Sequence, residues 1–263
     1  MTDIFLACIL LGMVTGVLAG LFGIGGGLVI VPVLVMLFSA HHFPAELILL
    51  MAVATSLATI IFTAISSVIA HHRLGSLLWA KVFSLSPAIM LGAALGAVVA
   101  KQMSAEYLRL ILVAFLLYVG VLMALQIKPK AGVAKPSKRL DAFVGVIIGL
   151  LSAIVGIGGG TLTVPYLVHG QHTMRQAVAV ASACGLPIAI VGTISYVLLG
   201  WQDVRLPEGC VGYVYLPAFL GTGLSSIFTA PLGAKLAHKL PAATLKRYFS
   251  LLLFIMAAKL LWH

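Results

Sequence analysis

The stretch Gly23-Ile24-Gly25-Gly26-Gly27, followed after four residues by Pro32, lies near the middle of a window, 4–45, that contains no Asp, Glu, Lys or Arg. A membrane-spanning helix needs about 20 mostly apolar residues, so this window is too long for one crossing. Glycine permits the backbone to turn, provided that protein or water satisfies its polar groups there. The stretch therefore predicts a helical hairpin that enters the membrane, breaks at the glycines and returns to the side from which it came.

The same pattern recurs 133 positions later, as Gly156-Ile157-Gly158-Gly159-Gly160 followed by Pro165, inside the charge-free window 142–174. Three shorter matches follow in the same order in the two halves: Ala52-Val53-Ala54 with Ala179-Val180-Ala181, Ser86-Pro87-Ala88 with Leu216-Pro217-Ala218, and Leu95-Gly96-Ala97 with Leu232-Gly233-Ala234. Ordered matches of this kind indicate an internal repeat. We expect a first repeat over 1–127, a basic cytoplasmic linker over 128–139 that contains two prolines, and a second repeat over 140–263.

The other charge-free windows each fit one spanning helix: 47–72, 82–100, 110–127, 176–202, 209–234, and 248–258 extended to Trp262. The chain has 263 residues, of which 62% are hydrophobic and 8% are charged, whereas soluble domains carry about 25% charged residues. We therefore expect an all-α integral membrane protein whose main partner is the lipid bilayer. The net charge of +10 does not indicate nucleic-acid binding, because the basic residues lie in short gaps between apolar runs.

Each half thus holds a hairpin, which makes an even number of crossings, and three spanning helices. The total is odd, so the second half begins on the opposite side and the repeats are inverted. This alternation places 12 of the 16 basic residues on one side. By the positive-inside rule that side is cytoplasmic, which predicts both termini outside a bacterial-type inner membrane. Five aromatic residues are expected in its interfacial belts: Trp79, Trp201, Tyr213, Tyr215 and Trp262.

The glycine breaks are also the candidate functional site. A short helix that begins at Leu28 or Thr161 would present free backbone N–H groups and the positive end of its dipole, which bind anions. Inverted repeats with interrupted helices are typical of transporters with a midplane site. The alternative is that these glycines serve close helix packing, which is the expected role of single glycines such as Gly92.

Hydroxyl groups on the second helix of each half can complete such a site, because they donate to anionic oxygens without the desolvation cost of a charge. Their alternative fate is bonding to the preceding helical turn. The predicted binding residues are Gly25, Gly26, Gly27, Thr55, Ser56, Gly158, Gly159, Gly160, Thr161 and Ser182.

Other chemistry is not indicated. The histidines lack the spacing of a metal site, no nucleophile–base pair suggests an enzyme, and no cofactor is expected. All six acidic residues lie at predicted helix ends or in loops, so we do not expect a protein carboxylate to carry protons near the midplane. Lys81 is expected to be an anchor at the membrane interface, with a role in attracting substrate as the alternative.

The paired glycine hairpins resemble those of the sulfite exporter TauE/SafE family, also called the toluene sulfonate uptake permease family. Ala54-Thr55-Ser56, the turn Arg73-Leu74-Gly75 before Trp79, and the segment Pro231-Leu232-Gly233-Ala234 carry the same resemblance. The second half departs from it, with Ala181-Ser182-Ala183 where the first has Ala-Thr-Ser. The resemblance implies a permease or exporter of a small sulfur-containing anion such as sulfite, thiosulfate or an organosulfonate. An anion channel, or a transporter of another small carboxylate or oxyanion, is the alternative. The sequence leaves the substrate, the direction and the oligomeric state open.

Overall fold

The computed structural model describes residues 2–22, 26–126, 137–237 and 242–262. The helices of this part are α1 (Thr2–Phe22), α2 (Gly27–Ala40), α3 (Ala45–Arg73), α4 (Trp79–Gln102), α5 (Ala105–Ala124), α6 (Lys138–Val155), α7 (Gly160–His169), α8 (Met174–Gly200), α9 (Leu216–Ala237) and α10 (Ala242–Trp262). Two short antiparallel strands, β1 (Cys210–Val211) and β2 (Val214–Tyr215), lie between α8 and α9.

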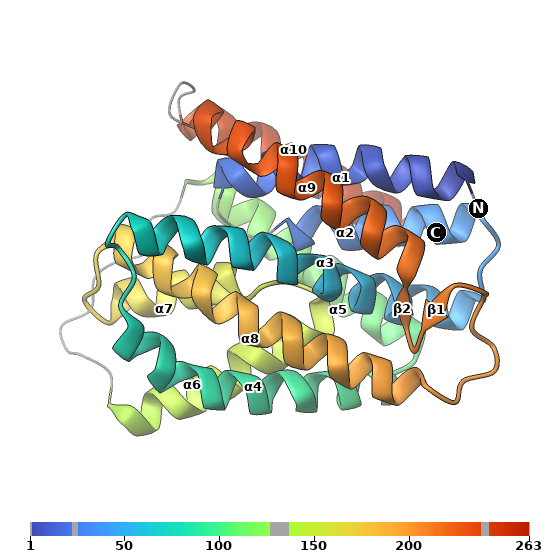
Figure 1. Cartoon of the computed structure of the whole chain (residues 1–263), viewed down its shortest axis with the longest axis horizontal. Helices are drawn as coiled ribbons and strands as arrows, with labels where there is room; N and C mark the ends of the chain where they lie inside the picture. The colour runs from blue at the N-terminus through green and yellow to red at the C-terminus, as the bar shows by residue number, and fades with distance from the viewer. Residues whose placement is uncertain (1, 23–25, 127–136, 238–241, 263) are drawn as a thin grey trace.

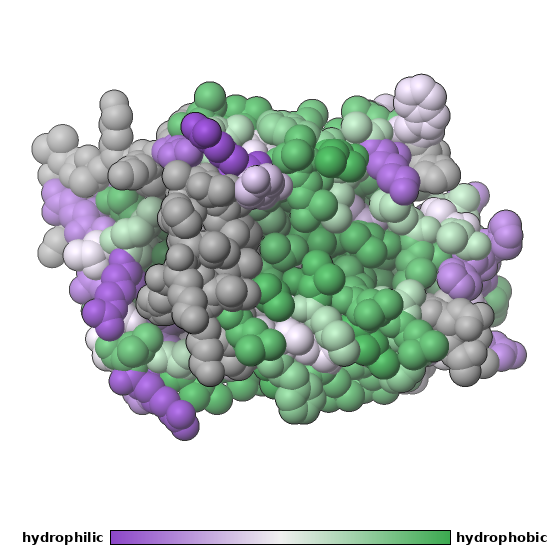
Figure 2. All heavy atoms as spheres, turned by 90° about the horizontal axis from the view of Figure 1, so that it is seen from above, coloured by the Kyte–Doolittle hydropathy of each residue, from purple (hydrophilic) through white to green (hydrophobic). Residues whose placement is uncertain are grey.

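The helices lie along the longest axis of the molecule, and both chain termini lie toward the same end of it (Figure 1). Figure 2 shows a mainly apolar surface across the middle of one face, with hydrophilic residues gathered at its two ends. Among the described residues, four helices are long and apolar enough to cross a membrane: α3, α4, α5 and α8. The architecture is that of an all-α membrane protein, as the sequence predicted.

Both predicted hairpins consist of a long helix followed by a short one. The short helices α2 and α7 begin at Gly27 and Gly160, one residue before the predicted starts. Figure 1 shows α7 running back toward the end of the molecule at which α6 begins. A hydrogen bond from Tyr166 on α7 to Asp141 in the first turn of α6 confirms that the two helices run in opposite directions.

The helix pairs α1–α9 and α4–α6 pack at short backbone separation. A β-carbon at Gly92 would lie 2.1 Å from the carbonyl oxygen of Val146, and one at Gly149 would lie 2.1 Å from that of Ile89. Within a bilayer, close packing of small residues is a main source of helix association. The packing role expected of Gly92 is therefore confirmed.

The centre of the molecule is formed by α3 and α8, which pack on each other. Residues 51–60, in the middle of α3, are at most 2% exposed. The short helix α2 packs on α3, and α7 packs on α8. This arrangement places both glycine breaks against the two most central helices.

The prediction that 209–234 forms a single helix is wrong at its beginning, since α9 starts at Leu216. Gly209 and Gly212 have positive φ angles of 86° and 54°, a conformation that favours glycine and breaks a helix. The chain instead forms the β1–β2 hairpin. Its residues Tyr213 and Tyr215 are 1% and 2% exposed, so the expectation that they belong to an interfacial aromatic belt is also wrong.

Candidate anion site at the glycine breaks

The second glycine break connects α6 to α7 through residues 156–159. Gly156 ends α6 with a φ of 77°, and Gly159 precedes α7 with a φ of 71°. Both angles lie in the left-handed region, which L-residues with side chains rarely adopt. The glycine pattern is therefore required by the backbone geometry of the break.

The break leaves several backbone donors without acceptors. Gly159 provides no side-chain cap for α7. Its carbonyl oxygen accepts bonds from the N–H groups of Leu162 and Thr163. Among the described residues, the N–H groups of Gly158, Gly159, Gly160 and Thr161 have no acceptor in the protein. Consecutive free N–H groups at a helix N-terminus form a positively polarised site for an anion.

The first glycine break has the same form where it is described, and it contacts the second. Gly26 precedes α2 with a φ of 75° and, like Gly159, provides no side-chain cap. A β-carbon at Gly27 would lie 2.6 Å from the carbonyl oxygen of Gly156 and 3.1 Å from the α-carbon of Ile157. The two breaks therefore meet in the interior, although the sequence separates them by more than a hundred residues.

Two of the predicted hydroxyl groups have partners within the protein. Ser56 donates to the carbonyl oxygen of Gly156 at 2.8 Å, and Thr55 accepts a hydrogen bond from the backbone N–H of Tyr215 at 3.1 Å. Both side chains are fully buried. Ser56 thus holds the second break in place, and Thr55 holds the β-hairpin against α3.

In the part of the chain that the structure describes, three hydroxyl groups around the second break have no partner although their oxygen atoms are buried: those of Ser152, Thr161 and Ser182. A β-carbon at Gly159 would lie 3.2 Å from the Ser152 oxygen. Ser182 precedes Gly185 by three residues, and a β-carbon at Gly185 would lie 2.9 Å from the carbonyl oxygen of Gly158. Ser182 therefore lies on the face of α8 that contacts the break.

The predicted residues that the structure describes are thus brought to one region, and the available donors lie mainly in the second half. Gly25 is outside the described residues. Ser152 was missed by the sequence analysis, because it precedes the glycine cluster within an otherwise apolar helix. Its position on α6, one turn before Gly156, was the signal that could have identified it.

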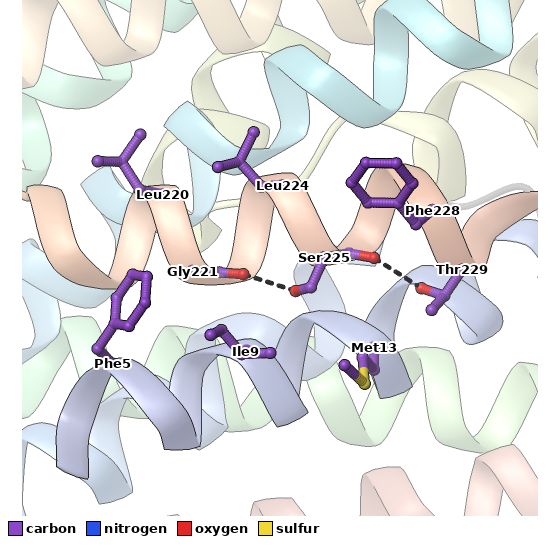
Figure 3. A pocket seen from close by; sticks show the side chains of 9 residues that line it. All are labelled: Phe5, Ile9, Met13, Leu220, Gly221, Leu224, Ser225, Phe228 and Thr229. Atoms are coloured by element: carbon purple, nitrogen blue, oxygen red, sulfur yellow. Dashed lines mark hydrogen bonds between the residues drawn. The ribbon is translucent and has the colours of Figure 1, made fainter. Parts of the chain in front are cut away.

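A groove between α1 and α9 is a poor candidate for the same role (Figure 3). It has a volume of about 400 Å³ and is lined by Phe5, Ile9, Met13, Leu220, Gly221, Leu224, Ser225, Phe228 and Thr229. Its two hydroxyl groups donate to carbonyl oxygens of their own helix, those of Gly221 and Ser225. The remaining lining is apolar, so the groove offers an anion no free donor.

Comparison with known proteins identifies the family of the chain. The model of the family described as "Sulfite exporter TauE/SafE" matches residues 8–260. The chain belongs to the sulfite exporter TauE/SafE family. A "Probable membrane transporter protein" of Haemophilus influenzae is 40% identical over 258 residues, which cover 98% of each chain. One of Methanocaldococcus jannaschii is 27% identical over 94% of this chain and 92% of its own. No solved structure matches.

This TauE/SafE family protein is a multi-pass membrane protein of a transporter family. Its glycine breaks lie inside the matched region. The names of the curated relatives state membrane transport and give no substrate.

Proposed function

We propose that this protein is a secondary transporter of a small sulfur-containing anion, such as sulfite, thiosulfate or an organosulfonate. The observation that carries the proposal is the set of unpaired donors at the second break, four N–H groups and three hydroxyl groups. All of them can donate to the oxygens that surround one sulfur atom. Buried donors without a partner are costly to the fold, which supports a ligand as their partner.

We further propose that the halves 1–127 and 140–263 are inverted repeats joined by the linker 128–139. If α1–α5 correspond in order to α6–α10, the α1–α9 pair corresponds to α6–α4, and the α3–α9 pair to α8–α4. All four of these helix pairs are packed in the structure. In addition, α3 packs on its own counterpart α8, and α5 packs on its own counterpart α10. This pattern supports alternating access, in which the two repeats rock around a shared midplane site.

The proposed orientation has both termini outside the inner membrane. The single-cysteine variants Thr2→Cys and Lys138→Cys test it, because Lys138 is exposed and lies within the proposed cytoplasmic linker, at the start of α6. We expect an impermeant maleimide to label Thr2→Cys on spheroplasts and to label Lys138→Cys after the membrane is permeabilised. Labelling of both positions from one side would mean that the topology is wrong.

Binding of sulfite, sulfate, thiosulfate, taurine and sulfoacetate to the detergent-purified protein tests the proposed substrate class. Uptake into proteoliposomes then separates a transporter from an anion channel, since a transporter saturates and shows counter-transport. Binding of simple carboxylates in preference to all sulfur anions would favour the alternative substrate class. Non-saturating flux without counter-transport would favour the channel.

A further inference from the structure

A largely buried ion pair lies near the starts of α4 and α6. The Nζ atom of Lys81 on α4 lies 2.8 and 2.6 Å from the two carboxylate oxygens of Asp141 on α6. The two side chains are 15% and 6% exposed. The expectation that Lys81 is an interfacial anchor is therefore wrong. Buried charges in membrane proteins are costly and usually serve function.

The ion pair is connected to α7 by a hydrogen bond. The hydroxyl of Tyr166 donates to the Asp141 carboxylate. Tyr166 lies six positions after Gly160, the first residue of α7. In the described part of the chain, α7 packs chiefly on α8. The Tyr166 hydroxyl thus ties α7 to α6, and through Lys81 to α4.

The backbone on both sides of α7 has turns in the left-handed region, at Gly159 with a φ of 71° and at Gln171 with a φ of 66°. α7 has only ten residues between them. The helix makes only about three turns, and its buried residues are Thr163, Leu167 and Val168. Its placement therefore depends strongly on the ties made by its side chains.

We propose that Tyr166, Asp141 and Lys81 are positioning residues of the transporter, which fix α7 so that its N-terminal N–H groups converge on the bound anion. The proposal rests on the function proposed above. It explains why the Lys81–Asp141 pair is largely buried at this place, and why the tyrosine that binds it is on the helix that supplies the N–H groups. The geometry of the hydrogen bonds from the N–H groups to the anion depends on the position and direction of α7. The Tyr166–Asp141 hydrogen bond therefore sets the affinity without contacting the ligand.

The molecule contains a matched control for the tyrosine hydroxyl. In the loop after α8, Tyr213 donates to Asp203 at 3.2 Å, and Arg205 binds the same carboxylate at 2.8 and 2.9 Å. The hydrogen bonds from Arg205 lower the pKa of Asp203 to about 2, so this carboxylate is ionised at neutral pH. Tyr213→Phe therefore removes the same kind of bond at a place that is not connected to α7.

Hydrogen–deuterium exchange on the full-length protein tests positioning without any ligand. We expect Tyr166→Phe to speed exchange within 158–169 about fivefold, the effect of losing one hydrogen bond. Tyr213→Phe should leave this segment unchanged. Equal exchange of 158–169 in Tyr166→Phe and the wild type would overturn the proposal. This outcome is independent of whether any anion in the panel binds, so it is distinct from a failure of the proposed function.

Sulfite titration tests the consequence for binding. We expect Tyr166→Phe to raise the Kd for sulfite about fivefold and Tyr213→Phe to leave it unchanged. The double variant Lys81→Met/Asp141→Leu removes both charges, which buried pairs often tolerate. Adding Tyr166→Phe to that background should have no further effect on the Kd. An unchanged Kd in Tyr166→Phe, or a full additional loss in the triple variant, would show that this cluster does not position the site.

Discussion

Replacing Thr161 with valine and Ser182 with alanine together should weaken anion binding by on the order of a hundredfold, with little change in the free energy of unfolding. A hydrogen bond to a charged group contributes about 1.5–3 kcal/mol, and each 1.4 kcal/mol is about tenfold in affinity. The two hydroxyl groups have no partner within the described protein, so their removal breaks no bond of the fold. Titration calorimetry with the preferred anion and thermal unfolding measure the two quantities.

Thr193→Val provides the matched control for this double variant. The Thr193 hydroxyl is also buried and without a partner. It lies on the same helix as Ser182, eleven positions further along, which is about 16 Å on a helix. We expect Thr193→Val to bind the anion as the wild type does. An equal loss in Thr193→Val, or wild-type affinity in the double variant, would remove the hydroxyl groups from the site.

The sequence predicted those parts of the fold that depend on local composition. Charge-free windows located the spanning helices, because charges are excluded from lipid-facing segments. The glycine clusters located both breaks to within one residue, because the backbone geometry of the breaks needs positive φ angles at Gly26, Gly156 and Gly159.

The hydrogen-bond and ion-pair partners of polar groups could not be predicted from the sequence, because they come from distant segments. Ser56 and its acceptor Gly156 are 100 positions apart, and Lys81 and Asp141 are 60 apart. A residue at a helix end can face lipid, water or a neighbouring helix, and only the packing of α4 against α6 decides this for Lys81. For the same reason the sequence does not reveal that Thr55 and Ser56 have protein partners, whereas the hydroxyl of Ser182 has none among the described residues.

Gly159→Val should abolish transport, with a loss of at least a hundredfold. Gly159 has a φ of 71°, and its β-carbon would lie 2.6 Å from the Cδ1 atom of Ile188. A valine there would move the start of α7 and cover the free N–H groups, so several hydrogen bonds to the charged ligand would be lost together. Uptake of the preferred anion into proteoliposomes measures the effect, after the amount of inserted protein has been determined.

Backbone strain alone has to be separated from loss of the site, and Gly75→Val does this. Gly75 has a φ of 63° with no atom within 4 Å of its β-carbon position, so valine there meets the same backbone strain in open space. We expect Gly75→Val to transport at close to the wild-type rate. Gly158→Ala complements this control, because Gly158 has no positive φ and its added β-carbon would lie 3.3 Å from the nearest atom, the Cγ2 of Ile60. We expect Gly158→Ala to reduce the transport rate about tenfold. If Gly159→Val and Gly158→Ala both insert normally and transport as the wild type does, the glycines serve packing and the anion binds elsewhere.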